Sequence, residues 1–369
     1  MAGSPKVGLV LGAGGVMGGA WLTGALEALA TETGWDPASA DRIVGTSAGS
    51  MIGALVASGV PPWFMVAHSA GRSFNGVVDG AGRPASGASR SGGAAFRYAG
   101  GLPPLGPGSW RLILDSLRTP SKHRPPALLA GWLPRGVIST EPLKDTIRRV
   151  VASGWTSHPS FWAIACDYAN GRRVAFGRED APEADLADAV AASCAIPGFY
   201  EPVEIGGRRY VDGGLWSTSN LDILRNQELD VVICLNPTSS LHPPFAWNPM
   251  ERIAAALRRT SGRRLGSERK KLVAAGVDVV LIQPTGDDHA AMGPNLMSTR
   301  NRNPVIQTAI RTVREQLRRP EARELLATLP PGPDYKIFEP SGPPSTWPDT
   351  LPGAPRRRPP VEEVDAEAV

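Results

Sequence analysis

The sequence predicts an α/β fold, in which a β-sheet carries helices on both faces. Two observations predict it. Apolar runs of strand length recur along the chain, and the segments between them carry apolar residues at helical spacing. The first two of these runs each lead directly into a glycine-containing turn and then into a helical pattern, which is typical of strand–turn–helix units.

The first elements follow in that order. Residues 7–11 are predicted to form a buried strand, and residues 18–30 a helix with one apolar stripe. Residues 42–45 form the second predicted strand. The helix after Ser47 is predicted to turn an apolar face to the core, made of Met51, Ile52, Leu55 and Val56.

The rest of the chain supplies the remaining strands. We predict them at five apolar runs, residues 161–166, 173–176, 208–211, 231–235 and 277–282. Between the first two of these runs, Asn170-Gly171 predicts a type I′ hairpin turn, because that dipeptide tolerates the positive φ angles which the turn requires.

Composition limits the class of protein. The chain of 369 residues has 42% apolar and 20% charged residues, which is typical of a soluble globular protein. Its formal net charge of +4 does not indicate a nucleic-acid partner. Cys166, Cys194 and Cys234 match neither a disulfide framework nor a metal site. No segment approaches the roughly 20 apolar residues of a transmembrane helix, and none resembles a secretory signal. We therefore expect a cytoplasmic protein, and any membrane contact would be peripheral.

The strongest chemical signal lies in the first fifty residues. Gly45-Thr46-Ser47-Ala48-Gly49 is a G-x-S-x-G pattern between a strand and a helix, where a serine side chain projects from a tight turn. Gly45 and Gly49 keep neighbouring side chains clear of that serine. Upstream, Gly12-Ala13-Gly14-Gly15 can turn consecutive backbone N–H groups toward an oxyanion. Together the two segments predict a serine hydrolase.

The glycine loop has a second interpretation, a dinucleotide-binding turn. The G-x-G-x-x-G fingerprint requires a third glycine three residues after Gly14, and Met17 occupies that position. The mismatch favours an anion-binding loop over a cofactor site.

A serine hydroxyl needs a base to accept its proton. Asp212-Gly213-Gly214 supplies a carboxylate at the end of a predicted strand, although Asp-Gly is also a common turn pair without any chemistry. The chain order Ser47, Asp212, His289 also matches the Ser-Asp-His triad of an α/β-hydrolase. Against that alternative, His289 lies in a polar segment that we expect to be a solvated loop.

These motifs resemble those of the patatin-like phospholipases, a family of lipid acyl hydrolases. The resemblance covers most of residues 6–320, and Ala192-Ser193-Cys194-Ala195-Ile196-Pro197-Gly198 also looks like the family's small-residue stretch ahead of its aspartate. It implies a three-layer patatin-like sheet, a Ser47–Asp212 dyad without histidine, and an oxyanion hole on the backbone of Gly14 and Gly15. It implies no cofactor. Many members carry a basic residue where this chain has Met17, which leaves the preference for anionic head groups open.

The predicted activity is hydrolysis of a carboxylic ester in a phospholipid, lysophospholipid or acylglycerol, so the expected partner is a lipid ester. An acyltransferase would use the same serine and pass the acyl group to an acceptor other than water; it stays an alternative, as does the triad esterase. Only two predicted strands precede Ser47, whereas several precede the nucleophile of an α/β-hydrolase, and this early position favours the dyad.

Three segments depart from the strand–helix pattern. Residues 78–108 are dense in Gly, Ala, Ser, Pro and Arg, and are interpreted as a flexible loop or lid, or as a disordered insertion. Residues 251–272 form a basic helix, either a solvated face or a contact for an anionic membrane. Residues 336–369 are typical of a disordered proline-rich tail. The predicted catalytic domain therefore spans residues 1–335.

Overall fold

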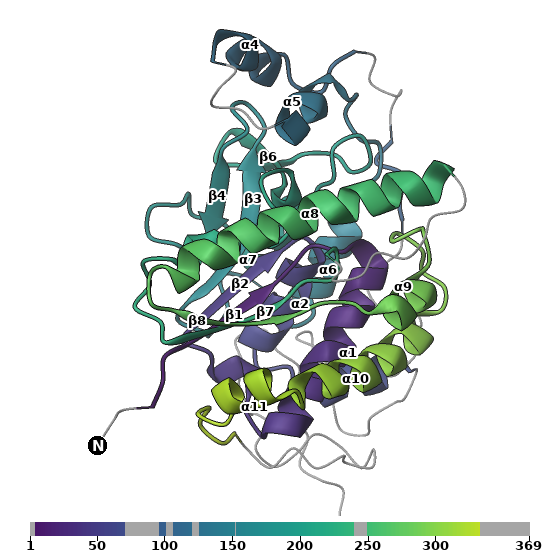
Figure 1. The fold of residues 1–369 in the computed structure, drawn as a ribbon. Helices are drawn as coiled ribbons and strands as arrows, with labels where there is room; N and C mark the ends of the chain where they lie inside the picture. Colours follow the sequence, from purple (N-terminus) through teal and green to yellow (C-terminus); the bar gives the residue numbers. More distant parts are fainter. Residues whose placement is uncertain are drawn as a thin grey trace, which may run out of the picture.

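A mixed sheet of eight strands lies between two layers of helices (Figure 1). The structure is a computed structural model that describes residues 4–70, 96–100, 106–119, 125–151, 153–239 and 249–332. The strands are β1 (Val7–Leu11), β2 (Arg42–Thr46), β3 (Phe161–Asp167), β4 (Arg173–Phe176), β5 (Val203–Ile205), β6 (Arg208–Asp212), β7 (Val231–Leu235) and β8 (Asp278–Ile282). Their order in the sheet is β5-β6-β3-β2-β1-β7-β8, and β4 pairs with β3.

The helices connect these strands and cover both faces of the sheet. They are α1 (Gly15–Thr33), α2 (Ala48–Ala57), α3 (Pro62–Ser69), α4 (Trp110–Arg118), α5 (Pro125–Trp132), α6 (Glu141–Arg148), α7 (Leu186–Cys194), α8 (Pro249–Val273), α9 (Gly286–Met292), α10 (Arg302–Leu317) and α11 (Pro320–Leu326). Short 3₁₀ turns are η1 (Pro37–Ser39), η3 (Gly213–Leu215) and η4 (Leu221–Leu224). In Figure 1, α8 crosses one face of the sheet, and α4 and α5 lie together at one end of the molecule.

The two faces of the sheet belong to two apolar clusters, because successive side chains of a strand point to opposite sides. Leu9 and Leu11 of β1 join the larger cluster, which includes side chains of α1, α2, α7 and α10. Val10 lies on the other face, in a cluster that includes Leu265 and Leu272 of α8. Residues buried on both faces explain why these strands appear in the sequence as continuous apolar runs.

Strands β2 and β6 approach each other end to end along one edge of β3. Strand β2 is parallel to β3 and places Thr46 opposite Ile164, whereas β6 is antiparallel and places Asp212 opposite Ala165. Strand β4 pairs with β3 over residues 163–166 and therefore occupies the other edge. The chain leaving β2 and the chain leaving β6 consequently meet beside the middle of β3, at Ile164 and Ala165.

The structure confirms the predicted α/β class, and every predicted strand is present with bounds that differ by one residue at most. Strand β5 was not predicted, because it has only three residues and an exposed glutamate at its centre. The type I′ turn is wrong: Gly171 has a φ of 65°, but Asn170 does not have a positive φ. A longer turn joins β3 and β4, in which the N–H of Gly171 donates to the carbonyl oxygen of Asp167 at 2.8 Å.

The predicted apolar face of α2 does pack against the core, but less deeply than expected. Val56 is buried, but the other three large side chains predicted to face the core are only half-buried. The buried face consists mainly of small residues: Gly49, Ser50, Gly53, Ala54 and Ala57. A Cβ on Gly53 would already lie 3.0 Å from the ring of Phe161, so α2 packs too closely on the sheet for large side chains there.

Two of the three unusual segments lie largely or wholly outside the described residues. Only residues 96–100 and 106–108 of the segment 78–108 are described, and the segment 336–369 is not described at all. The basic segment 251–272 is confirmed as a helix, within α8. No helix in the described ranges is long and apolar enough to cross a membrane.

Candidate active site

Ser47 lies on a sharp turn between β2 and α2. Its φ of 53° and ψ of −122° form a combination that residues other than glycine rarely adopt, and such strain is typical of a nucleophile elbow. Ser47 is also the N-cap of α2, whose first N–H groups favour negative charge at this position. Only 4% of the residue is exposed, so the hydroxyl is largely shielded from water.

The turn at Ser47 requires both glycines of its motif. A Cβ on Gly45 would lie 2.4 Å from the Cα of Ser50, and a Cβ on Gly49 would lie 2.0 Å from the carbonyl oxygen of Leu11. Both contacts involve backbone atoms, which cannot move aside as a flexible side chain does. The glycines therefore let α2 begin directly against β1, and this close approach fixes the direction of the serine.

Asp212 ends β6, and its carboxylate lies close enough to the hydroxyl of Ser47 for that group to lower the pKa of the carboxyl. Its Oδ1 also accepts the backbone N–H of Gly214 at 2.7 Å. Burial raises the pKa of the carboxyl from 3.8 to about 6, although the hydrogen bonds from Ser47 and Gly214 lower it. The carboxylate is therefore charged at neutral pH and is a stronger proton acceptor than an exposed aspartate.

The Asp212-Gly213-Gly214 segment is also a tight turn, as its composition predicts. Asp212 caps η3 through the bond to Gly214, and a Cβ on Gly213 would lie 2.2 Å from the carbonyl oxygen of Ile164. The same turn that holds the carboxylate thus packs against β3. The turn interpretation and the proton-acceptor interpretation are compatible, because one geometry satisfies both.

The glycine loop after β1 presents two adjacent backbone donors. The N–H of Gly12 donates to Leu235 at 2.9 Å, and that of Ala13 donates to Thr218 at 2.7 Å. The N–H groups of Gly14 and Gly15, at the start of α1, have no acceptor among the residues that the structure describes. Because β1 and β2 are parallel neighbours, this loop and the Ser47 turn leave the same edge of the sheet.

The conformation of that loop requires glycine. Gly15 has a φ of 60°, and a Cβ there would lie 2.9 Å from the carbonyl oxygen of Leu296. A Cβ on Gly14 would lie 2.7 Å from both the Cα of Gly18 and the ring of Pro237. Two adjacent N–H groups without an acceptor, held in a rigid loop, are what the oxyanion of a tetrahedral intermediate needs.

Ser193 of α7 joins the Ser47 turn to the centre of the sheet, and the sequence did not predict this role. Its hydroxyl accepts the backbone N–H of Ser47 at 2.9 Å and donates to the carbonyl oxygen of Ile164 at 2.6 Å. It is fully buried. The stretch 192–198 is rich in small residues, but no local pattern singles out its serine as a partner of Ser47.

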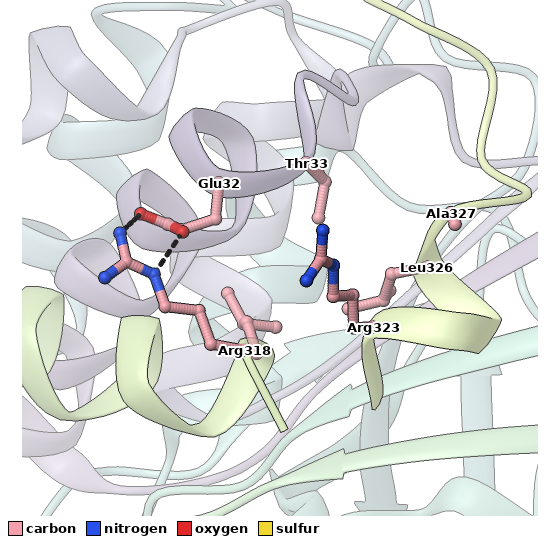
Figure 2. Close-up of a pocket in the computed structure, with 7 residues that line it drawn as sticks. Glu32, Thr33, Arg318, Arg323, Leu326 and Ala327 are labelled. Atoms are coloured by element: carbon pink, nitrogen blue, oxygen red, sulfur yellow. Dashed lines mark hydrogen bonds and ion pairs between the residues drawn. The ribbon is translucent and has the colours of Figure 1, made fainter. Parts of the chain in front are cut away.

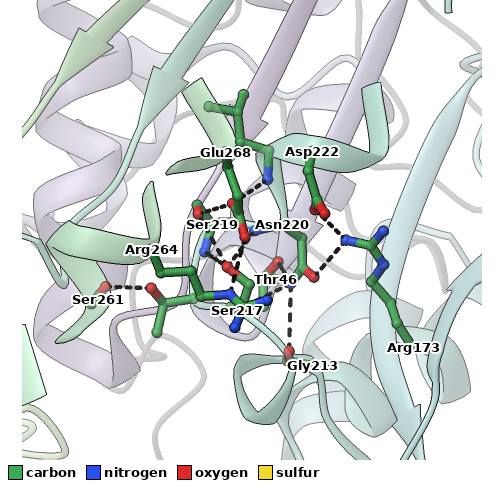
Figure 3. A network of polar contacts seen from close by, with 12 residues as sticks. Thr46, Arg173, Gly213, Ser217, Ser219, Asn220, Asp222, Ser261, Arg264 and Glu268 are labelled. Carbon is green, nitrogen blue, oxygen red and sulfur yellow. Dashed lines mark hydrogen bonds and ion pairs between the residues drawn. The ribbon is translucent and has the colours of Figure 1, made fainter. Parts of the chain in front are cut away.

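Asn220 links the turn that carries Ser47 to the turn that carries Asp212 (Figure 3). Its Nδ2 donates to the hydroxyl of Thr46 at 3.0 Å, to the carbonyl oxygen of Gly213 at 3.4 Å and to that of Ser217 at 2.6 Å. Its Oδ1 accepts from Arg173 at 3.2 Å. One buried amide thus contacts the residue before the serine and the residue after the aspartate, although 174 positions separate Asn220 from Thr46 in the chain.

Glu268 fixes the loop that carries this asparagine. Its Oε2 accepts the hydroxyl of Ser219 at 2.6 Å and the N–H of Leu221 at 3.0 Å, and its Oε1 accepts Nε of Arg264 at 3.1 Å. Figure 3 shows these contacts between α8 and the loop. One arginine of the basic helix is therefore engaged in holding the site. Other basic side chains of α8 are exposed: Arg259, Arg263, Arg269, Lys270 and Lys271.

The two remaining residues considered in the sequence have other surroundings. Met17 is 1% exposed and belongs to the core, and its N–H donates to Leu296 at 3.0 Å. His289 does not lie in a solvated loop, as expected, but is buried within α9. The expectation was wrong because Thr285 caps this polar segment as a helix. In the described part of the chain, the carboxylate of Asp212 contacts Ser47 and Gly214 rather than His289.

Cys194 is a second nucleophilic side chain beside the serine. Its thiol interacts with the side chains of Ser47 and Ser50. Burial and the charge of Asp212 raise the pKa of the thiol to about 12. The thiol therefore stays protonated at neutral pH and is a poor nucleophile, which leaves Ser47 as the more reactive group.

A pocket of about 500 Å³ lies at the far end of α1 and does not belong to this site (Figure 2). Glu32 in its wall is held by Nε and Nη2 of Arg318 at 2.8 and 3.0 Å. The hydroxyl of Thr33 donates to Leu29 at 2.7 Å. Since Gly15 and Glu32 are seventeen residues apart on one helix, the pocket is roughly 25 Å from the glycine loop.

The model of the family described as patatin-like phospholipase matches residues 9–225, which is more than half of the chain.

Proposed function

The chain belongs to the patatin-like phospholipase family, a hydrolase family of lipid esterases, and from this premise we propose that Ser47 and Asp212 form its catalytic dyad. The observation that carries the proposal is the contact between a strained serine and a buried carboxylate at the ends of β2 and β6. The raised pKa of Asp212 supports its role as the base.

In the first half of the reaction, Ser47 Oγ attacks the carbonyl carbon of the ester while its proton passes to Asp212. The N–H groups of Gly14 and Gly15 stabilise the negative charge on the former carbonyl oxygen. When the tetrahedral intermediate collapses, the bond to the leaving alcohol breaks. The alcohol oxygen takes the proton from Asp212, and the acyl group stays on Ser47.

In the second half, water attacks the acyl carbon and gives its proton to Asp212. The same two N–H groups stabilise the second oxyanion, and the bond to Ser47 Oγ then breaks. The serine recovers a proton from Asp212, and the fatty acid leaves. The carboxyl group acts as a base and then as an acid in each half, so no histidine is required.

The proposed substrates are phospholipids, lysophospholipids or acylglycerols. Met17 occupies the position at which many family members carry a basic side chain, and here that position belongs to the core. The glycine loop of this chain therefore offers backbone donors alone, which suits an ester carbonyl of any of the three classes.

We also propose that residues 1–335 act as one catalytic domain. The family match ends at residue 225, but β7 pairs with β1 over its whole length, from Val7 opposite Val231 to Leu11 opposite Leu235. Strand β8 pairs with β7 in turn. This pairing supports a single domain, because the strand that leads into the glycine loop is covered only when the later strands are present.

The proposal is tested by hydrolysis of a medium-chain nitrophenyl ester, a phospholipid, a lysophospholipid and an acylglycerol. Ser47→Ala and Asp212→Asn should lose activity on every substrate, whereas His289→Gln should keep it. If His289→Gln is as inactive as Ser47→Ala while it stays folded, the triad is correct and the dyad is wrong. Products formed with an added alcohol distinguish the alternatives: free acid indicates a hydrolase, and a new ester indicates an acyltransferase.

A further inference from the structure

Large apolar side chains are exposed in one region of the molecule. Among the residues that the structure describes, nine large apolar side chains are exposed, and eight of them lie between residues 96 and 133. They are Phe96, Tyr98, Trp110, Leu114, Leu117, Leu129, Trp132 and Leu133. Exposed apolar groups gathered in this way usually mark a contact surface. We call this group, on and around α4 and α5, the apolar tip.

Helix α4 is apolar on two opposite faces. Leu112 packs inward against Cys166, Tyr168 and Val211 of the sheet. Trp110, Leu114 and Leu117 follow one another at helical spacing, and they are exposed by 60%, 51% and 72%. The inner face accounts for the folding of the helix, but nothing in the fold requires three large apolar residues on the outer face.

The apolar tip is firmly attached to the catalytic part of the molecule. The hydroxyl of Tyr168, just after β3, donates to the carbonyl oxygen of Ala130 in α5 at 3.0 Å. The hydroxyl of Ser109, the N-cap of α4, donates to the backbone of Tyr168. Helix α5 also contacts η3, the turn that begins directly after Asp212. A surface that binds the tip is therefore held close to the proposed dyad.

Three arginines lie beside the tip: Arg111 follows Trp110 in α4, Arg135 is two residues after Leu133, and the carbonyl oxygen of Arg209 accepts the N–H of Tyr168, the residue that holds α5, at 2.8 Å. Burial lowers the pKa of Arg209 on β6, and the nearby charges of Arg135 and Arg111 lower it further. None of the three forms an ion pair with any described residue, and Nη1 of Arg209 is buried without a hydrogen-bond partner. Tyr168, and then Glu204 opposite Arg209 on β5, raise the pKa of Arg209 and so act against this lowering. Mutually repelling guanidinium groups of this kind bind phosphate well.

We propose that the apolar tip docks on the surface of an anionic phospholipid membrane. Its tryptophans and leucines enter the boundary between head groups and acyl chains, and Arg111, Arg135 and Arg209 bind lipid phosphates. Tryptophan with leucine at the surface and arginine beside them is the composition of interfacial membrane-binding helices. The inference rests on the proposed function, because it names the surface that brings a lipid ester to Ser47.

Sedimentation with lipid vesicles tests docking separately from catalysis. The protein used is Ser47→Ala, and the vesicles are either pure phosphatidylcholine or equal parts phosphatidylcholine and phosphatidylglycerol. Binding to the anionic vesicles should exceed binding to the neutral ones by about tenfold or more, and the difference should decrease as salt is added. Leu117→Ser should weaken binding to both kinds of vesicle, whereas Arg111→Glu with Arg135→Glu should remove the preference for anionic lipid.

Two matched controls lie on α8. Val273 is the exposed large apolar residue that lies outside the tip in the described part of the chain. Val273→Ser therefore removes an exposed apolar side chain, as Leu117→Ser does, but at a distance from the tip. Lys270→Glu with Lys271→Glu repeats the change of charge on an exposed face. Both controls should bind like the parent protein. Thermal unfolding of each variant shows whether it is folded.

Three results would overturn the proposal. One is equal binding to both kinds of vesicle by folded protein, and another is loss of binding in the α8 variants but not in the tip variants. A third is a dimer that Leu117→Ser dissociates, with no vesicle binding, since the tip would then be covered by a second copy of the chain. The catalytic dyad and the membrane docking can be contradicted separately. If the protein binds vesicles but the wild type hydrolyses no ester, only the dyad is contradicted. If the wild type hydrolyses esters but the protein does not bind vesicles, only the docking is contradicted.

Discussion

The direction of Ser47 depends on a hydroxyl group from α7. Ser193 satisfies two buried backbone groups at once, the N–H of Ser47 and the carbonyl oxygen of Ile164. The serine therefore keeps a strained backbone because it is tied to the central strand, rather than because its own turn is stable.

Ser193→Ala should lower both stability and rate. It leaves two buried polar groups without a partner, which costs about 1–3 kcal/mol of unfolding free energy, and it frees the turn that aims the nucleophile. Urea unfolding and kcat for a soluble ester measure the two effects. Ser50→Ala is the matched control, because the carbonyl oxygen of Ser47 that it bonds also accepts the N–H groups of Ser50 and Met51. Equal effects from the two variants would show that Ser193 has no special role.

Single residues divide into those that the sequence identifies and those that it does not. Ser47 and Asp212 stand in short motifs whose glycines mark a special backbone, so a single sequence identifies them as candidates. Ser193 and Asn220 act through contacts with residues more than a hundred positions away, and no local pattern records such contacts. The sequence misleads at His289, because a short capped helix of polar residues has the composition of a solvated loop.

At the scale of elements, the site depends on how closely α2 packs on β1. Gly49→Ala should prevent this packing, since its Cβ would lie 2.0 Å from the carbonyl oxygen of Leu11. We expect a loss of about 4 kcal/mol or more of stability, or no soluble protein. Gly266→Ala in α8 is the control: a Cβ there meets nothing within 4 Å, and it should stabilise the helix by about 0.5–1 kcal/mol. Thermal unfolding of both variants distinguishes these results, and a folded Gly49→Ala protein of normal stability would contradict the account.

The elements themselves were largely predictable, but their arrangement was not. Buried strands such as β1 and β7 are continuous apolar runs of strand length, so apolar patterning alone predicts them. The end-to-end approach of β2 and β6 follows from pairing with β3, a strand more than a hundred residues after β2. That pairing brings Ser47 and Asp212 together, and the sequence contains no local signal for it. The family resemblance predicts that Ser47 and Asp212 act together, which the local patterns alone do not.

At the scale of the whole molecule, two buried carboxyl groups make stability depend on pH. Burial raises the pKa of Glu27 in α1 to about 7 and that of Asp212 to about 6. Both folded-state pKa values lie above the unfolded ones, so their contribution to stability is complete below about pH 4 and is lost as pH rises through about 6 to 7. The protein should therefore be less stable at pH 8 than at pH 5 on account of these groups.

Replacing the carboxyl group of Glu27 or of Asp212 by an amide should reduce the loss of stability between about pH 5 and about pH 8. Glu27→Gln and Asp212→Asn should each stabilise the protein at about pH 8 by on the order of 2 kcal/mol, and by about half of that or less at about pH 5. Urea unfolding across this range measures the effect. Glu321→Gln, at an exposed position at the start of α11, should leave the pH profile of the wild type unchanged. A wild-type profile that is flat, or parallel to those of the two variants, would show that neither carboxyl is buried as described.

The central claim is that Asp212, without a histidine, activates Ser47. The most direct measurement is the rate at which a fluorophosphonate labels Ser47 as a function of pH, in the wild type, Asp212→Asn and His289→Gln. We predict that the wild type and His289→Gln lose reactivity together as pH falls through about 6, the pKa of the buried Asp212, and that Asp212→Asn is hardly labelled at any pH. Labelling of Asp212→Asn at the wild-type rate, or loss of labelling in folded His289→Gln, would contradict the account.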